Sequence, residues 1–195
     1  MIENSTKENI LNSSTKLFLK KGYNASGLQE ILTAANVPKG SFYHFFKSKE
    51  MLGKEVLAHY SDENKPIIKR YLVDYKATPL SRLEAFFDEI TRHYEQDAEC
   101  SGGCLIGNLA QEMSETNESF RILIETIFSD WKLYFTTCLK EAQQAHEISQ
   151  DIDTEELAEV MLNSWEGALL KMKVTKSVAP LRGFKKIFFS LLTNQ

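Results

Sequence analysis

Apolar residues recur along most of this 195-residue chain with the spacing of α-helices. In the clearest stretch, residues 117–146, an apolar stripe follows one helical face from Phe120 to Ala142. Strict alternation of apolar and polar residues, which is typical of half-buried strands, is missing over any strand-length stretch. The pattern therefore predicts an all-α protein.

Glycine, proline and capping residues divide the pattern into nine predicted helices. We place them at residues 5–21, 28–35, 39–45, 48–76, 80–97, 104–115, 117–146, 153–175 and 181–193. Gly22 stands where a glycine commonly follows a helix end, and Ser48 is suited to cap the fourth helix. Pro66 lies inside that fourth helix and should kink or split it, because proline removes a backbone hydrogen bond.

Composition and charge narrow the class of protein. An apolar share of 43% with 11% aromatic residues is enough for a core and excludes intrinsic disorder. The net charge is −4, but residues 1–60 contain eight lysines against five acidic residues, a net +3 that leaves −7 on the remainder. This asymmetry indicates a basic recognition module joined to an acidic body.

The basic segment contains the spacing of a helix-turn-helix. The predicted helices at 28–35 and 39–45 are separated by only three residues, and the second helix of such a pair fits the major groove of DNA. That second helix carries polar and aromatic side chains with lysines close behind it, which suits phosphates flanking a groove. The spacing alone also allows a plain helical hairpin with a solvated lysine face.

The same segment resembles the DNA-binding domain of TetR-type transcriptional repressors. The resemblance rests on Gly22-Tyr23, the Ala34-Ala35-x-Val37 turn, Gly40-x-x-Tyr43 and Phe46-x-x-Lys49-Glu50-x-Leu52. It implies an N-terminal three-helix helix-turn-helix DNA-binding domain at residues 1–50. It also implies a C-terminal helical domain at residues 51–195 that binds an effector and forms the dimer.

The resemblance further implies that two copies bind a double-stranded operator. The candidate DNA-binding residues are Ser26, Lys39, Ser41, Tyr43, His44, Lys47 and Lys49. Two positions depart from the family pattern, because Gly27 replaces a common hydroxyl residue and Phe45 stands where His or Tyr is frequent. Each departure removes one candidate phosphate contact.

The C-terminal half is expected to bind a small-molecule inducer and to form the homodimer. Helices 153–175 and 181–193 are apolar on one face and, in this family, pair with their symmetry mates as a four-helix bundle. Packing within one chain only is the alternative. Candidate residues of an apolar ligand pocket are Phe86, Tyr94, Met113, Phe120, Trp131, Phe135 and Trp165.

Cys104 follows two glycines at the predicted start of a helix. A helix N-terminus stabilises thiolate and lowers the pKa of a cysteine, which makes the sulfur more reactive. The motifs Gly103-Cys104-Leu105, Ala110-x-Glu112, Ser119-x-Arg121 and Gly167-Ala168-x-Leu170-x-x-Lys173 resemble the N-ethylmaleimide- and electrophile-responsive branch of the family. If Cys104 senses electrophiles, Lys173 would lend a positive charge to the thiolate, and Cys100 is the candidate resolving partner. A buried structural cysteine is the alternative at position 104, and Cys138, on an apolar face, is expected to be inert.

A small helical enzyme, or a ligand-binding protein that does not contact DNA, is the second hypothesis. Against an enzyme, the four histidines show no metal-binding or nucleophile spacing, so we expect no metal, no cofactor and no catalytic residues. No apolar run is long enough for a membrane span, and the first seven residues contain no apolar signal core, so we expect a cytoplasmic protein. The sequence thus predicts a dimeric, DNA-binding repressor released by a small molecule or by an electrophile or oxidant.

Overall fold

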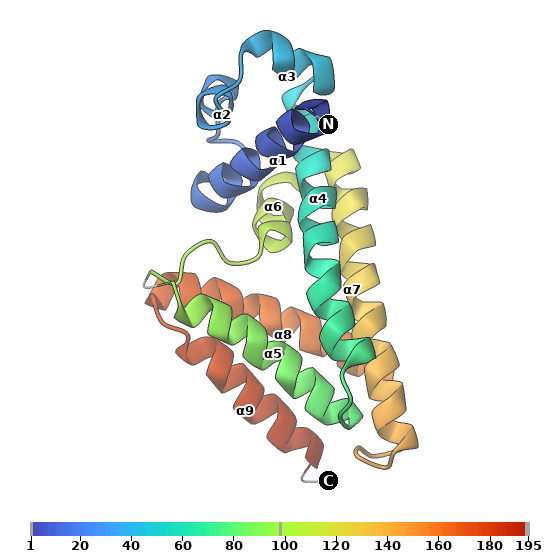
Figure 1. Ribbon diagram of the computed structural model, residues 1–195. Helices are drawn as coiled ribbons and strands as arrows, with labels where there is room; N and C mark the ends of the chain where they lie inside the picture. Colours follow the sequence, from blue (N-terminus) through green and yellow to red (C-terminus); the bar gives the residue numbers. More distant parts are fainter. Residues whose placement is uncertain (1, 98, 194–195) are drawn as a thin grey trace. The chain divides into compact units, whose positions relative to one another are not determined.

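A computed structural model describes residues 2–97 and 99–193, and all regular structure in these ranges is helical (Figure 1). The helices are α1 (Ile2–Lys21), α2 (Leu28–Ala34), α3 (Lys39–Phe45), α4 (Lys49–Lys69), α5 (Pro79–Glu95), α6 (Leu105–Met113), α7 (Glu118–Gln144), α8 (Thr154–Thr175) and α9 (Ala179–Thr193), with a short π-helix, η1 (Arg70–Asp74), after α4. The all-α prediction is confirmed. Within the described residues, no helix combines the length and apolar character that a membrane crossing requires.

The chain forms two compact units. The first contains the residues up to Glu63 together with Cys104–Ile127, and the second contains Asn64–Gly103 and the chain from Phe128 onward. The predicted domains, residues 1–50 and 51–195, were defined by function, whereas these two units are defined by packing. The predicted domain boundary therefore stays a prediction.

In the first unit, α1 packs against α2 and α6. The side chain of Asn9 on α1 donates a hydrogen bond of 2.7 Å to the Ala35 carbonyl at the end of α2. Gly53 of α4 lies against two aromatic rings, since a Cβ at this position would come within 2.7 Å of ring atoms of both Tyr23 and Phe120. Contacts this short exclude a side chain at position 53 unless the rings move.

The fourth helix differs from its prediction at Pro66. We expected this residue to kink or split the helix, but α4 stays helical through it and ends only at Lys69, where the backbone widens into the π-helix η1. A proline inside a helix has no N–H to donate, so one carbonyl of the preceding turn loses its hydrogen bond. In α4 this loss does not end the helix, and the change to π-helical geometry comes only four residues later. The expected split is therefore wrong, and the helical path that was predicted to reach residue 76 ends at Asp74.

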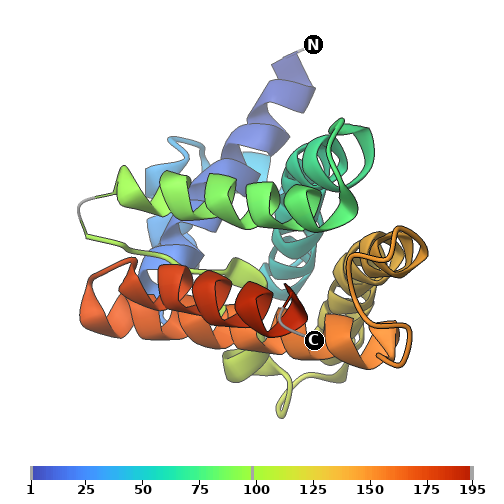
Figure 2. The same ribbon diagram turned by 90° about the horizontal axis from the view of Figure 1, so that it is seen from below.

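In the second unit, α5, α8 and α9 lie side by side (Figures 1 and 2). Phe87 of α5 is fully buried at their centre. Five aromatic rings surround it with centroids 4.8–6.2 Å away, namely Phe86, Phe135, Trp165, Phe184 and Phe189. Rings at these separations add to the stabilisation from burying their area.

Helices α8 and α9 keep a second apolar face that stays exposed. On α8 the exposed residues include Val160, Leu170 and Val174, which is 70% exposed, and on α9 they include Ile187 and Leu191, which is 63% exposed. Packing within the described residues therefore leaves these apolar side chains uncovered.

Candidate nucleic-acid interface and effector region

Helices α2 and α3 meet through a short turn that sequence chemistry explains. Asn36 adopts a left-handed conformation with φ of 53°, which asparagine tolerates better than most residues. Its neighbour Val37 donates a backbone hydrogen bond of 3.0 Å to the Leu32 carbonyl, and Pro38 immediately precedes α3. The two helices are thus joined by four residues, the arrangement of a helix-turn-helix.

Helix α3 is anchored by one face and open on the other. Phe42, and Phe46 just after the helix, are fully buried, and their ring centroids lie 5.6 Å apart. Tyr43 is 50% exposed and packs edge-on against Phe42, with the Lys39 ammonium 5.9 Å from the centre of its ring. The aromatic anchors therefore hold a helix whose outer face is polar and basic.

The structure groups most of the predicted DNA-binding residues around this outer face. Four of these residues are exposed, namely Lys39, Tyr43, His44 and Lys47, and Ser41 is half-buried. All five lie in α3 or within the two residues after it. Exposed lysines beside a projecting polar helix suit contacts to phosphates and base edges.

Ser26 and Lys49 are placed differently from their expected role. The Ser26 side chain is fully buried, and its hydroxyl donates a hydrogen bond of 2.7 Å to the Gly22 carbonyl. A phosphate contact through this hydroxyl would require that bond to break. The half-buried Lys49 ammonium donates to the Tyr23 carbonyl at 2.7 Å and lies 4.3 Å from the centre of the Tyr23 ring.

Glu112 of α6 connects to the same turn and was not predicted from the sequence. Its two carboxylate oxygens accept the backbone N–H groups of Tyr23, at 3.1 Å, and Asn24, at 2.9 Å. Gly22 has φ of +85°, and any Cβ there would collide with the Glu112 carboxylate. Burial lowers the pKa of the Lys49 ammonium, and the nearby negative charge of Glu112 opposes this shift. Glu112 belongs to the Ala110-x-Glu112 motif, but the sequence did not reveal these contacts, because its partners are almost 90 residues away.

The seven predicted pocket residues are divided between the two compact units. Met113 and Phe120 belong to the first unit, where both are buried, and the other five belong to the second. Phe86, Phe135 and Trp165 pack in the aromatic core around Phe87. Tyr94 is half-buried near the end of α5.

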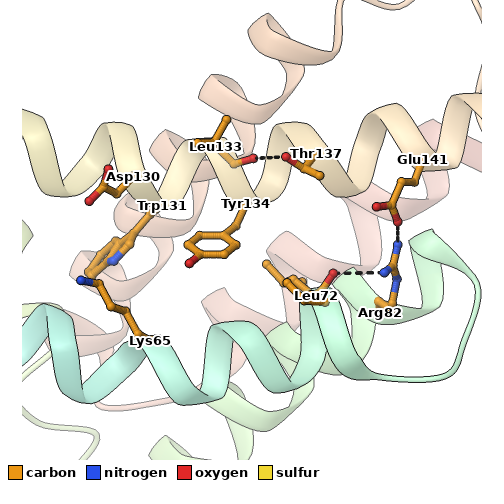
Figure 3. A pocket seen from close by; sticks show the side chains of 10 residues that line it. Lys65, Leu72, Arg82, Asp130, Trp131, Leu133, Tyr134, Thr137 and Glu141 are labelled. Carbon is orange, nitrogen blue, oxygen red and sulfur yellow. Dashed lines mark hydrogen bonds and ion pairs between the residues drawn. The ribbon is translucent and has the colours of Figure 1, made fainter.

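Trp131 does line a cavity, which lies between α7 and the end of α4 with η1 (Figure 3). Its volume is about 460 Å³, within the range of small-molecule sites. Arg82 of α5 closes one end, where it donates hydrogen bonds to the Leu72 carbonyl and to Glu141. Sequence reasoning missed Arg82, although a basic residue on the apolar face of α5 was a signal that it pairs inside the protein.

The two residues predicted to sense electrophiles lie at the ends of their helices. Cys104 is the N-cap residue of α6 and is buried, and Lys173 lies in the last turn of α8. The side chain of Lys173 covers Gly103, since a Cβ there would come within 2.8 Å of the Lys173 Cδ. Cys138 is buried in the second unit, and burial raises the pKa of its thiol to about 11.

Within residues 2–97 and 99–193, no group of three or more His, Cys, Asp or Glu side chains is arranged to hold a metal ion.

Comparison with known proteins matches both halves of the chain. The family model described as "Bacterial regulatory proteins, tetR family" matches residues 10–56, and that described as "Tetracyclin repressor-like, C-terminal domain" matches residues 79–188.

Individual relatives match nearly the whole length. The chain is 34% identical to the HTH-type transcriptional repressor DhaR of Mycobacterium sp. (strain GP1), over 98% of this chain and 94% of the relative. It is 34% identical to the transcriptional regulator AcuR of Cereibacter sphaeroides, over 93% and 82% respectively. The crystal structure of the reduced form of E. coli NemR matches with a TM-score of 0.87 at 26% identity, covering 98% of both chains.

The Glu112→Ala variant should loosen the turn before α2. Without the carboxylate, two backbone N–H groups lose their acceptor, which should lower the free energy of unfolding by about 1–3 kcal/mol. Hydrogen exchange of the Tyr23 and Asn24 amides should become faster, as measured by NMR. The Glu112→Gln variant keeps one acceptor oxygen and should show a smaller change. Unaltered exchange at both amides in Glu112→Ala would contradict this role.

Proposed function

Because the chain belongs to the TetR family of DNA-binding transcriptional regulators, we propose that it is a dimeric repressor that an effector releases from its operator. The effector is a small molecule or an electrophile or oxidant. The family consists of regulators rather than enzymes, which decides against the small helical enzyme and the ligand-binding protein without DNA contacts. Residues 1–50 act as the DNA-binding domain, and residues 51–195 bind the effector and form the dimer.

The polar, basic face of α3 is the observation on which DNA binding rests. Lys39 and Lys47 flank Tyr43, and all three are exposed, while the helix is anchored from behind by Phe42. This arrangement supports base-edge contacts from Ser41, Tyr43 and His44, with phosphate contacts from Lys39 and Lys47. Lys49 adds positive charge at the start of α4. In a dimer, the two α3 helices would enter successive major grooves about 34 Å apart.

The exposed apolar faces of α8 and α9 support dimerisation through these helices. Packing within one chain leaves Val174 and Leu191 more than 60% exposed, so the alternative of intramolecular packing alone does not cover them. A second copy, placed by a two-fold axis, would bury the same face on both subunits and form a four-helix bundle.

Helix α6 is suited to carry the effector signal to the DNA-binding domain. Its N-cap is Cys104, and it ends one residue beyond Glu112, whose carboxylate binds the turn before α2. A signal that displaces the start of this nine-residue helix would therefore also displace Glu112. An effector that prefers the displaced arrangement would shift the population away from the DNA-bound state.

Thiol sensing at Cys104 is the finer part of the proposal. The position of Cys104 at a helix N-terminus and the length-wide similarity to NemR support it. DhaR and AcuR are more similar to this chain in sequence than NemR is, so membership of the electrophile-responsive branch rests on the cysteine itself.

DNA binding is tested with duplexes selected from a random pool. The Lys39→Ala/Lys47→Ala double variant should lose affinity and lower the slope of log K against log salt by about 2, because each lysine neutralises about one phosphate. The matched control is Lys16→Ala/Lys20→Ala, which removes two exposed lysines of α1. An equal loss of DNA affinity in the two double variants would contradict the proposed DNA interface. Failure of the unaltered protein to bind DNA at low ionic strength would contradict it as well.

The dimer surface is tested by the Val174→Glu/Leu191→Glu variant. Two buried, unpaired charges at the proposed interface should convert the protein to monomers and abolish tight operator binding, as measured by light scattering and by DNA titration. Ile122→Glu, at a residue that is 53% exposed on α7, should leave the dimer intact. A persistent dimer in the double variant would place the interface elsewhere.

The thiol mechanism is tested with N-ethylmaleimide. The reagent should release DNA from the unaltered protein and from Cys138→Ser, but not from Cys104→Ser. Cys138 should stay unmodified near neutral pH, because raising the pKa of its thiol from 9.0 to about 11 lowers the thiolate fraction about a hundredfold. Release of the Cys104→Ser variant by N-ethylmaleimide would refute sensing at Cys104 and leave reversible effector binding as the mechanism.

A further inference from the structure

Helix α8 carries one exposed stripe that the other described residues leave uncovered. Val160, Leu170 and Val174 belong to it and are 46–70% exposed. The exposed Gly167 lies on the same stripe, because these four positions follow one another at intervals of seven, three and four residues. The stripe thus combines large apolar side chains with a recess at a glycine.

The packing of the single chain does not explain the glycine. A glycine in a helix interior destabilises the helix relative to alanine, and it is most useful where another backbone or side chain comes close. Gly167 lies well inside the 22-residue helix α8, yet a Cβ at this position would have no described atom within 4 Å. At Gly53, by contrast, the same atom would lie 2.7 Å from two aromatic rings. The recess at Gly167 can therefore receive a side chain of another molecule.

The stripe also carries opposite charges at its two ends. Glu156 lies in the first turn of α8 and Lys171 lies near its end, and both are exposed. Neither side chain has an ion-pair partner among the described residues, whereas the neighbouring Glu155 and Glu159 pair with lysines of α7. A second copy of α8 that runs antiparallel would bring Glu156 of one chain to Lys171 of the other.

One antiparallel register satisfies both features at once. The step from Glu156 to Val160 is four residues, and so is the step from Gly167 to Lys171. A pairing that places Val160 of one chain on Gly167 of the other therefore also places Glu156 opposite Lys171. A surface that matches itself after a two-fold rotation is what an isologous dimer contact requires, so the pattern selects a second copy of this chain as the occupant.

We propose that, in the dimer, α8 packs antiparallel against α8 of the second copy, with Val160 of each chain packed on Gly167 of the other and Glu156 opposite Lys171. This inference deepens the proposed function and rests on the dimer proposed there. It adds the orientation of the two helices and the residues that determine it. Because Gly167 has no side chain, the helices can approach closely at this point, since the distance between packed helices depends on the side chains at the contact.

The recess is tested by Gly167→Leu. In the dimer, the new side chain would occupy the space of Val160 of the second copy at two symmetric places, so the dissociation constant of the dimer should rise at least about thirtyfold. In the monomeric Val174→Glu/Leu191→Glu variant, the same substitution should instead raise the melting temperature by about 3 °C, because leucine favours a helix more than glycine does. Sedimentation velocity over a dilution series measures the first effect, and thermal unfolding followed by circular dichroism measures the second.

The matched control is Thr137→Leu, which adds the same side chain at an exposed position of α7 in the same compact unit. Because this position lies outside the stripe, the dissociation constant of the dimer should stay within about twofold of that of the unaltered protein.

The register is tested by exchanging charges. Glu156→Lys and Lys171→Glu each place like charges opposite one another twice in a homodimer, so each variant alone should dimerise about tenfold more weakly than the unaltered protein at low salt. Mixing the two single variants should restore the affinity, because both contacts of the mixed dimer then join opposite charges. An affinity tag on one variant should therefore retain the other.

Four results would overturn the register. These are an unchanged dissociation constant in Gly167→Leu, an equal rise in Thr137→Leu, a lower melting temperature when Gly167→Leu is added to the monomeric variant, or no preference for the mixed dimer over the two homodimers. If Val174→Glu/Leu191→Glu dissociates the dimer but these results are found, the register alone is refuted. If the dimer persists in Val174→Glu/Leu191→Glu, the dimer surface of the proposed function is refuted as well.

Discussion

One carboxylate determines how the helix-turn-helix is attached within its unit. Glu112 accepts the N–H groups of Tyr23 and Asn24, at the point where the chain leaves α1 with a positive φ at Gly22. Lys49 meets the same turn by donating to the Tyr23 carbonyl. The turn is therefore bound both by α4, which follows α3, and by α6. Helix α3 itself has only seven residues, and its buried Phe42 and the neighbouring Phe46 hold it in place.

Most of the helical pattern was predictable because its causes are local. Gly22 has the left-handed backbone that was expected after α1, and the Ser48 hydroxyl accepts the Met51 N–H as an N-cap does. Pro66 was the exception, since the sequence does not reveal whether the surrounding structure tolerates a lost hydrogen bond or breaks the helix there. Local chemistry thus gives the elements and most of their ends, and it fails where the outcome depends on tertiary packing.

Candidate functional residues could be named from the sequence where a motif carries them. The α3 residues belong to a compact pattern, and Lys39, Tyr43 and Lys47 are each exposed in the structure. Periodicity, in contrast, identifies an apolar face without identifying what covers it. Phe135 and Trp131 lie on the same helix and both were candidate pocket residues, but Phe135 packs against Phe87 whereas Trp131 lines the cavity between α7 and the end of α4. Partners far apart in sequence decide between these outcomes.

Gly53 places a mechanical limit on how the first unit can respond to a signal. Helix α4 approaches the rings of Tyr23 and Phe120 more closely than a methyl group would permit. Sliding α4 along its own axis would bring the larger side chains on either side of the glycine against these rings, whereas swivelling about the glycine keeps both contacts. The close approach at Gly53 therefore favours a change in the angle of α4 over a slide along its axis.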